Sequence, residues 1–278
     1  MDTKKVSFEK ATLRDQYDAA RREEIARLMD PRTGKLDARF ARETSCLLCG
    51  SADRAPLFTK QGMDFVRCTA CRFMYVNPQV NEAVLEDAYR QSRSNDIWFK
   101  ILKTPGQQKY NDEKYAWFLD EIAKSVPSPS RLLDVGCSLG HFMALARDRG
   151  YETLGLELGA KAAAYAREHH GLDVRETRVE NLQEADGAFG AATLFGVLEH
   201  LSDPVGILRV LRRVLRPDGV LALLVPNTES LVARILHGDA FGFDGRNHLG
   251  YYTKDTLTEA LAKAGFAPVR MKTVVTCI

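Results

Sequence analysis

An aspartate at the end of a short apolar stretch, followed by two spaced glycines, is the first feature of this sequence that could do chemistry. Residues 132–135 predict a buried strand, with Asp134 near its carboxyl end. Open α/β sheets bind their ligands at that end of the strands. Gly136 and Gly140 predict a tight turn, and the apolar pattern after it predicts a helix that ends at Gly150. A strand, a glycine turn and a helix in this order indicate a nucleotide-binding site.

The residues of the turn select among nucleotides. A dinucleotide fingerprint that begins at Gly136 needs glycine at positions 138 and 141, because the pyrophosphate approaches the backbone closely. The sequence has Ser138 and His141 there. A second acid, Glu157, ends the next predicted strand, where a carboxylate can bind ribose hydroxyls. The pattern fits a ligand with ribose hydroxyls and no phosphate, which indicates S-adenosylmethionine.

At these residues the sequence resembles the class I S-adenosylmethionine-dependent methyltransferases. Residues 134–140 are similar to their first motif, Glu157 to the acidic residue after their second strand, and residues 198–201 (LEHL) to the segment after their fourth strand. The resemblance runs from about residue 128 to nearly the end of the chain. It implies that the cofactor lies against the glycine turn, with its ribose at the acidic residue and its adenine beside the loop after the third strand. The cofactor-binding residues it implies are Asp134, Gly136, Cys137, Gly140, Glu157, Glu180, Asn181 and Leu182.

Two C-x2-C pairs predict a metal site. Cys46 and Cys49 precede Cys68 and Cys71 by a spacing typical of a four-thiolate zinc site. Two disulfides or unrelated buried cysteines are the alternatives, and the N-terminus lacks the apolar core of a signal peptide, which argues against disulfides. Four thiolates leave no open position for substrate, so we expect a structural zinc ion in a small ribbon. Arg72 occupies a position in the second pair's turn where glycine is more usual.

Methyl transfer needs alignment of the acceptor atom with the methyl group, and a base only where the acceptor loses a proton. The candidates for that base are His248, His200 and Tyr252. His248 lies in a long aromatic-rich connection, residues 228–252, after the fifth predicted strand, where we expect the acceptor pocket. A lone loop histidine is more often incidental than catalytic, and His200 can instead orient the loop beside the cofactor.

Strands alternate with helices from residue 131 onwards, which predicts a Rossmann-like, doubly wound, mostly parallel α/β sheet preceded by the zinc ribbon and helical segments. The predicted strands are 131–135, 152–157, 173–179, 189–194, 220–225 and 269–276, and the predicted helices between them include 159–170, 204–216 and 253–264. The family usually adds a seventh, antiparallel strand. Here the sequence stops before it, so that strand is absent or the chain is truncated.

Four segments are expected along the chain: 1–45, helical; 46–78, the zinc ribbon; 79–127, a helical lid or linker; and 128–278, the cofactor-binding domain. The helix predicted within the first has charges of alternating sign, typical of a solvated face. A dimerisation arm, and hence a homodimer, is the alternative. Aromatic residues in the third segment either pack on the sheet or form a lid over the cofactor, and the resemblance favours the lid.

Composition restricts the partners. The formal net charge is +2, and no run of eighteen apolar residues occurs. We therefore expect a cytoplasmic protein without a membrane or nucleic-acid partner. The favoured acceptor is a small molecule such as a sugar, a polysaccharide precursor or a secondary metabolite. The alternatives are an RNA methyltransferase whose zinc ribbon binds RNA, and a non-catalytic scaffold that binds zinc and the cofactor.

Overall fold

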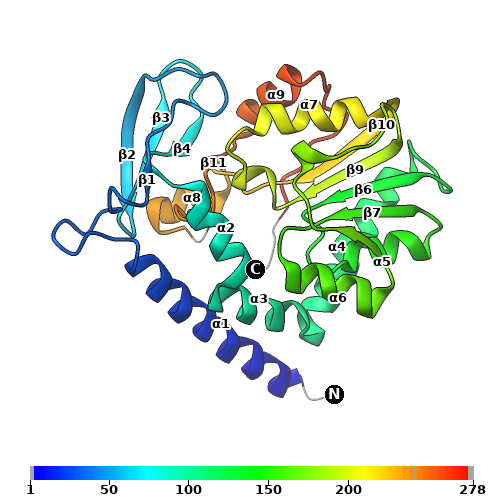
Figure 1. Cartoon of the computed structure of the whole chain (residues 1–278), viewed down its shortest axis with the longest axis horizontal. Helices are drawn as coiled ribbons and strands as arrows, with labels where there is room; N and C mark the ends of the chain where they lie inside the picture. The colour runs from blue at the N-terminus through cyan, green and yellow to red at the C-terminus, as the bar shows by residue number, and fades with distance from the viewer. Residues whose placement is uncertain (1–2, 241, 275–278) are drawn as a thin grey trace. The chain divides into compact units, whose positions relative to one another are not determined.

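The computed structural model describes residues 3–240 and 242–274 (Figure 1). The chain forms two compact units that interleave along the sequence. The first unit comprises Met1–Arg27, Ala83–Leu194 and Arg213–Leu223, and the second comprises Leu28–Glu82, Phe195–Arg212 and Leu224–Ile278. The four-segment division expected from the sequence stays a prediction. Within the described ranges, no helix combines the length and the apolar character that crossing a membrane requires.

The first unit is built on a five-stranded sheet with the order β10-β9-β6-β7-β8. Its strands are β6 (Arg131–Val135), β7 (Glu152–Leu156), β8 (Asp173–Arg175), β9 (Phe189–Phe195) and β10 (Leu215–Leu224). β6 pairs in parallel with both β7 and β9, and β7 pairs in parallel with β8. Almost every residue of β6 and β9 is buried, as in parallel strands covered on both faces. The predicted Rossmann-like α/β sheet is confirmed.

Six α-helices belong to this unit among the described residues. They are α1 (Thr3–Ala26), α2 (Glu82–Gln91), α3 (Arg93–Leu102), α4 (Pro105–Ala123), α5 (His141–Asp148) and α6 (Ala160–His170), with a 3-10 turn at Val179–Asn181. α3, which was not predicted as a separate helix, begins at an N-cap, Ser92, whose Oγ accepts from Asn95 N. Glu24 of α1 accepts from the N–H and the hydroxyl of Ser94, at 2.9 and 2.6 Å. α1 thus packs on α3 in its own unit, and its role as a dimerisation arm stays a prediction.

Gly140, which joins the glycine turn to α5, needs to be glycine for two reasons. Its φ is +78°, and a Cβ there would lie 2.6 Å from Leu172 Cδ1 and 2.9 Å from Ala166 Cβ. We expect Gly140→Ala to lower the free energy of unfolding by about 2–4 kcal/mol, the sum of left-handed strain and overpacking. Gly171→Ala is the matched control, because φ is +64° there and no atom lies within 4 Å; it should cost only about 1–2 kcal/mol. Denaturant unfolding measures both, and equal losses would contradict the steric part of the argument.

The second unit holds an antiparallel sheet with the order β11-β4-β3-β2. Its strands are β2 (Arg54–Lys60), β3 (Met63–Cys68), β4 (Met74–Val76) and β11 (Gly250–Tyr251), and β1 (Ala41–Arg42) pairs separately with β5 (Gln79–Val80). Its helices are α7 (Pro204–Val214), α8 (Leu231–Leu236) and α9 (Lys254–Lys263), with 3-10 turns at Leu198–His200 and His237–Asp239. Thr253 caps α9 in a capping box with Thr256.

β11 is the part of this sheet that the sequence did not predict. It comes from the long connection expected to form a pocket loop, and it places Gly250 opposite Tyr75 and Tyr251 opposite Met74. Val76 N donates to Leu249 O at 3.1 Å, which extends the pairing by one residue. The residues around His248 are therefore held at the edge of the ribbon sheet.

Three strand predictions were wrong in extent. β10 runs from Leu215 to Leu224, so it begins before the predicted start at residue 220 and takes in the last two residues of the helix predicted for 204–216. Residues 269–274 form no strand, and residues 275–276 of the predicted strand lie outside the described chain. Val269 is 96% exposed, so the β-branched residues there have no sheet face to bury. β8 ends at Arg175, and the chain then turns into the short helix Val179–Asn181 instead of continuing as strand to Val179.

Candidate functional site

Asp134 sits near the carboxyl end of β6, where the sequence predicted it, and the residue is only 3% exposed. The register between β6 and β9 places it opposite Thr193, whose Oγ1 lies 2.6 Å from Asp134 Oδ1 and donates to it. Burial raises the pKa of Asp134 to about 7, although the Thr193 hydrogen bond opposes this, and the nearby charge of Glu157 adds to the rise. The site thus contains a buried acid whose charge has no cationic partner among these neighbours.

Glu157, directly after β7, ties the glycine turn to the next loop. Its Oε2 accepts from Ser138 N at 2.9 Å, and its Oε1 accepts from Gly159 N at 2.7 Å. Burial raises the pKa of Glu157, and the backbone N–H groups oppose that rise. Each carboxylate oxygen has more than one acceptor site. Both oxygens can therefore accept ligand hydroxyls while they hold the backbone.

The glycine turn itself folds onto the end of β7. The N–H groups of Gly136 and Cys137 both donate to Leu156 O, at 2.8 and 3.1 Å, and Gly140 N donates to Cys137 O at 2.9 Å. Gly136 takes φ +72°, which glycine allows without strain. Cys137 is buried, and burial raises the pKa of its thiol, so it is a packing residue within the turn. The predicted residues Asp134, Gly136, Cys137, Gly140 and Glu157 are thus brought together.

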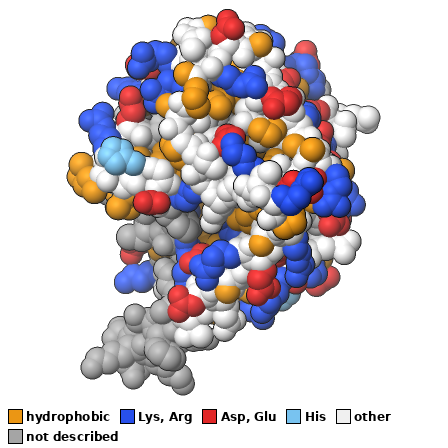
Figure 2. All heavy atoms as spheres, turned by 90° about the vertical axis from the view of Figure 1, so that its left-hand side faces the viewer, with side chains coloured by type: hydrophobic (Ala, Val, Ile, Leu, Met, Phe, Trp, Pro, Cys, Tyr) orange, Lys and Arg blue, Asp and Glu red, His pale blue; other side chains and the backbone are white. Residues whose placement is uncertain are grey.

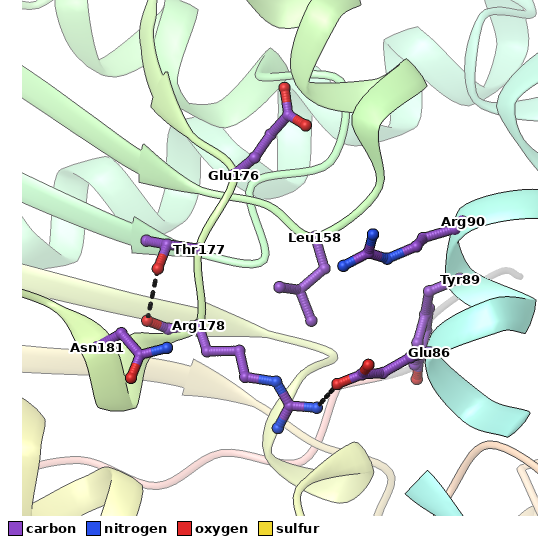
Figure 3. Close-up of a pocket in the computed structure, with 8 residues that line it drawn as sticks. All are labelled: Glu86, Tyr89, Arg90, Leu158, Glu176, Thr177, Arg178 and Asn181. Carbon is purple, nitrogen blue, oxygen red and sulfur yellow. Dashed lines mark hydrogen bonds and ion pairs between the residues drawn. The ribbon is translucent and has the colours of Figure 1, made fainter. Parts of the chain in front are cut away.

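A cavity of about 260 Å³ lies next to this group in the same unit (Figure 3). Its lining comes from α2, from the residue after Glu157 and from the segment after β8: Glu86, Tyr89, Arg90, Leu158, Glu176, Thr177, Arg178 and Asn181. Arg178 Nη2 donates to Glu86 Oε1, so an ion pair joins the two walls. Leu158, which directly follows Glu157, places this cavity beside the Glu157 residue.

Of the three residues predicted beside the adenine, Asn181 lines this cavity, Leu182 is buried, and Glu180 is exposed beside Arg178. Leu158 was not predicted as a site residue, and for α2 the sequence predicted only that its segment, residues 79–127, forms a lid or linker, without naming the residues that line the cavity. The position of Leu158 directly after Glu157 was a usable signal. The α2 contribution depends on a contact between distant segments, which no local pattern reveals.

The four predicted zinc ligands, Cys46, Cys49, Cys68 and Cys71, converge in the second unit. Their Sγ atoms all lie within 4.8 Å of one another, and the pairs Cys46–Cys71 and Cys49–Cys68 are each 3.5 Å apart. Disulfide sulfurs are about 2.05 Å apart, so these pairs are not disulfides. Four thiolates at about 2.3 Å from one tetrahedral zinc ion would stand about 3.8 Å from each other. The donor set and its spacing fit zinc.

Both cysteine pairs form the same turn. Gly50 N donates to Cys46 O at 2.8 Å, and Arg72 N donates to Cys68 O at 3.0 Å. Gly50 has φ +78° and Arg72 has φ +65°. Arg72 therefore adopts the left-handed conformation that its position requires, although it is not glycine, and the second turn is equivalent to the first.

The predicted catalytic residues His200 and His248 lie together in the second unit, and Glu199 joins them. The two imidazole rings are perpendicular with centroids 4.7 Å apart, and the ligand atoms of all three side chains lie within 4.8 Å of one another. His248 Nδ1 is 3.2 Å from Gly242 O, so Nδ1 donates and Nε2 carries the lone pair. Glu199 precedes His200 directly in the LEHL segment, and its place in this cluster beside His248 comes from the structure. We call Glu199, His200 and His248 the Glu-His-His cluster.

Tyr252, the third predicted catalytic residue, adds a buried phenol to this region. Burial raises its pKa well above the ordinary value, and the charge of Glu199 adds to the rise. Glu199 is 3% exposed, and burial raises its pKa to about 8. Across the described ranges, neither Glu199 Oε2 nor Tyr252 Oη has a hydrogen-bond partner. Buried polar atoms without partners are costly and are typical of places where a ligand supplies the missing contact.

A hydrogen-bonded loop fixes His248 in this position. Asp244 O accepts from His248 N at 2.9 Å, and Asp244 Oδ1 accepts from the N–H groups of Arg246 and Asn247 at 3.2 and 3.3 Å. On the far side of His248, Leu249 N donates to Glu199 O at 2.7 Å. The main chain therefore places Glu199 and His248 side by side, whatever their side chains bind.

Comparison with known proteins connects this geometry to a family. The chain is 34% identical over 116 residues to the ubiquinone biosynthesis O-methyltransferase of Xanthomonas campestris pv. campestris. The match covers 39% of this chain and 48% of that protein. The protein of the same name from Pseudomonas aeruginosa matches at 30% over 103 residues, covering 35% and 44%. The chain thus spans about half the length of the curated relatives it matches.

Solved structures resemble this chain more weakly. An S-adenosylmethionine-dependent methyltransferase from Archaeoglobus fulgidus superposes with a TM-score of 0.48 at 20% identity, covering 58% of this chain and 72% of that one. The family model described as a methyltransferase domain matches residues 107–270, which is more than half of the chain and includes the glycine turn, Glu157 and the Glu-His-His cluster. The chain therefore belongs to the methyltransferase-domain family.

Proposed function

We propose that this protein transfers a methyl group from S-adenosylmethionine to a hydroxyl group of a small molecule. The observation that carries the proposal is the Glu157 carboxylate, held by Ser138 N and Gly159 N at the end of β7. It lies beside a cavity and beside a glycine turn that has serine and histidine where a pyrophosphate fingerprint needs glycine. A methyltransferase-domain match over residues 107–270 supports it.

The cofactor side of the reaction belongs to the first unit. When bound, S-adenosylmethionine supplies a methyl group on a positively charged sulfonium. Glu157 would accept the ribose hydroxyls, and the cavity beside Leu158 and Asn181 would take the adenine. Asp134, with its buried carboxyl group, would face the positively charged end of the molecule across the glycine turn. Gly136, Cys137 and Gly140 would form the surface of that turn.

The acceptor side belongs to the second unit. An acceptor hydroxyl must lose its proton as it is methylated, and the Glu-His-His cluster with Tyr252 provides the groups for this. His248 is the first choice among them, because its Nδ1 donates to Gly242 O and its Nε2 is the accepting nitrogen. The zinc ion expected at the four cysteines is structural, because its thiolate ligands leave no open position.

A small-molecule acceptor is favoured over RNA by two observations. The relatives at 30–34% identity are named as O-methyltransferases of ubiquinone biosynthesis, whose substrates are small molecules with hydroxyl groups. On the face drawn in Figure 2, basic and acidic side chains are interspersed, without the continuous basic surface that phosphate binding favours. A phenolic hydroxyl and a sugar hydroxyl can both accept a methyl group in this reaction. The methyl-transfer assay described next distinguishes these two classes of acceptor.

The test is a methyl-transfer assay with radiolabelled donor against two panels, hydroxylated small molecules and total RNA. Transfer to a phenol or sugar hydroxyl that stops in His248→Ala supports the proposal. Labelled RNA would favour the RNA alternative. Tight donor binding without transfer to either panel or to a cell extract would favour the non-catalytic scaffold.

We expect Glu157→Gln to weaken binding of S-adenosylmethionine by about 2 kcal/mol, or roughly 30-fold, because ribose hydroxyls lose their bonds to a charged acceptor. Glutamine keeps the size of the side chain and one carbonyl acceptor for the backbone. Glu152→Gln, an exposed acid at the start of β7, is the control. Isothermal titration calorimetry of both variants measures the difference, and unchanged affinity in Glu157→Gln would remove the ribose from this position.

A further inference from the structure

We infer that Glu199, His200 and His248 bind one divalent transition-metal cation, distinct from the zinc of the cysteines. The role of that cation as the activator of the acceptor hydroxyl rests on the proposed function, whereas its binding does not. The inference begins with the ligand atoms of the three side chains, which lie within 4.8 Å of one another in the second unit.

The donor set is that of a transition metal. Two imidazole nitrogens and one carboxylate oxygen bind zinc, iron, cobalt or manganese, and they leave coordination positions open for water or substrate. The four cysteines differ in this respect, because soft thiolates select zinc and close its coordination. The two sites can therefore be loaded with different ions.

The orientation of both histidines fits ligation. Metal-bound histidine usually donates its other ring N–H to a carbonyl or carboxylate, which fixes the tautomer. His248 donates from Nδ1 to Gly242 O at 3.2 Å, and His200 forms a hydrogen bond with the backbone of Asn247. Each ring thus has one nitrogen fixed by the main chain of the same loop, and the other is the potential ligand.

Glu199 supplies the independent observation. Its side chain is 3% exposed, and its Oε2 has no hydrogen-bond partner in the part of the chain that the structure describes. Its backbone carbonyl accepts from Leu249 N at 2.7 Å, so it cannot move far from His248. A buried carboxylate oxygen without a partner is costly, and a cation is the partner that offsets this cost most effectively.

The geometry requires a modest closure. Donors at about 2.1 Å from a common ion stand about 3.0–3.4 Å apart in octahedral or tetrahedral coordination. The three ligand atoms are within 4.8 Å of one another, so side-chain rotations that bring them together suffice. The hydrogen-bonded loop of Asp244 and Asn247 keeps the backbone in place during that closure.

The bound cation would change how the acceptor loses its proton. An acceptor hydroxyl that binds at an open position has its pKa lowered, as metal-bound water does. Its O–H bond breaks, the proton passes to water, and the electron pair stays on the metal-bound oxygen as the nucleophile. In this form His248 gives its lone pair to the cation and does not take the proton itself.

The experiment is a titration of the full-length chain with Mn²⁺, followed by the loss of the free-ion signal in electron paramagnetic resonance. Prior dialysis against a mild chelator and metal analysis define the starting content. We expect about one Mn²⁺ per chain, with binding weakened at least about tenfold in His248→Ala and in Glu199→Gln. A second zinc that resists dialysis and is missing from both variants would support the same site.

The control is His237→Asn, which replaces an exposed histidine of the same unit outside the Glu-His-His cluster. It should bind Mn²⁺ like the parent chain. Calorimetry with S-adenosylmethionine on every variant separates the two proposals. Mn²⁺ binding that is absent at millimolar concentration, or equal in His248→Ala, would overturn the metal site and leave the proposed function standing. Metal binding without any binding of the methyl donor would overturn the proposed function and leave the metal site standing.

Discussion

Cys68→Ser is expected to remove zinc from the chain and to unfold the ribbon sheet of the second unit. Cys68 is fully buried at the end of β3, and its sulfur is 3.5 Å from that of Cys49. A serine hydroxyl is a far weaker zinc ligand than a thiolate. Structural zinc contributes about 10–16 kcal/mol to small domains that fold with it, which is comparable to the whole stability of a typical domain. We therefore expect the loss of about one zinc ion per chain and a fall in the unfolding temperature.

The damage should reach the Glu-His-His cluster and not the cofactor site. β4 pairs with β11, Val76 N donates to Leu249 O, and Leu249 N donates to Glu199 O, so the ribbon sheet and the cluster share a backbone network. The residues proposed for the cofactor all belong to the first unit. Cys68→Ser should abolish methyl transfer and Mn²⁺ binding while it preserves binding of S-adenosylmethionine.

Cys137→Ser is the matched control, because it makes the same replacement at a buried cysteine outside the ribbon. It should retain zinc. Metal analysis by mass spectrometry, with unfolding followed before and after a strong chelator, measures both variants. A parent chain that carries no zinc, or that unfolds at the same temperature after chelation, would contradict the structural role assigned to the four cysteines.

The features that the sequence predicted correctly are local in the chain. The glycine turn, the acid after β7 and the two cysteine pairs each occupy a few consecutive residues, and chemistry restricts which residues can stand there. Arg72 shows how far such a pattern extends: it takes the positive φ of a glycine because the turn around the metal ligands requires it. The alternation of strands and helices likewise predicted the parallel sheet, since parallel strands need crossover connections between them.

The features that were missed depend on contacts between distant segments. β11 has only two residues, too few for a periodic pattern, and it becomes a strand only because β4 offers an open edge. The buried Glu199 belongs to the Glu-His-His cluster because Leu249, far along the chain, pairs with its carbonyl. The error at residues 269–274 is the converse case. Their β-branched residues favour a strand, but without a neighbouring strand or a buried face that preference has no effect.

Asp134→Asn is expected to stabilise the cofactor-free chain by up to about 4 kcal/mol above pH 7 and hardly at all near pH 4. The folded state raises the pKa of Asp134 to about 7, chiefly through burial, from an ordinary value of 3.8. Below pH 3.8 the group is protonated in both the folded and the unfolded chain, so its ionisation costs nothing. Between pH 3.8 and 7 the folded chain binds more protons than the unfolded chain, and the free energy of unfolding falls as the pH rises. Above pH 7 the cost is complete, at about 1.4 kcal/mol for each unit of difference.

Asparagine cannot ionise, yet it keeps the Oδ1 acceptor for the hydroxyl of Thr193, so the comparison isolates the charge. Denaturant unfolding of both chains from pH 4 to 8 should give curves that separate steadily up to pH 7 and then run parallel. Asp173→Asn, an exposed acid at the start of β8, should show no such separation. With S-adenosylmethionine bound, the parent chain should be more stable than the asparagine variant. The positive charge of the cofactor then offsets the negative charge of Asp134, which the variant lacks. A difference in the free energy of unfolding that stays the same at every pH would show that the buried carboxyl group ionises at no cost. That result would remove the reason for placing the positive end of the cofactor beside Asp134.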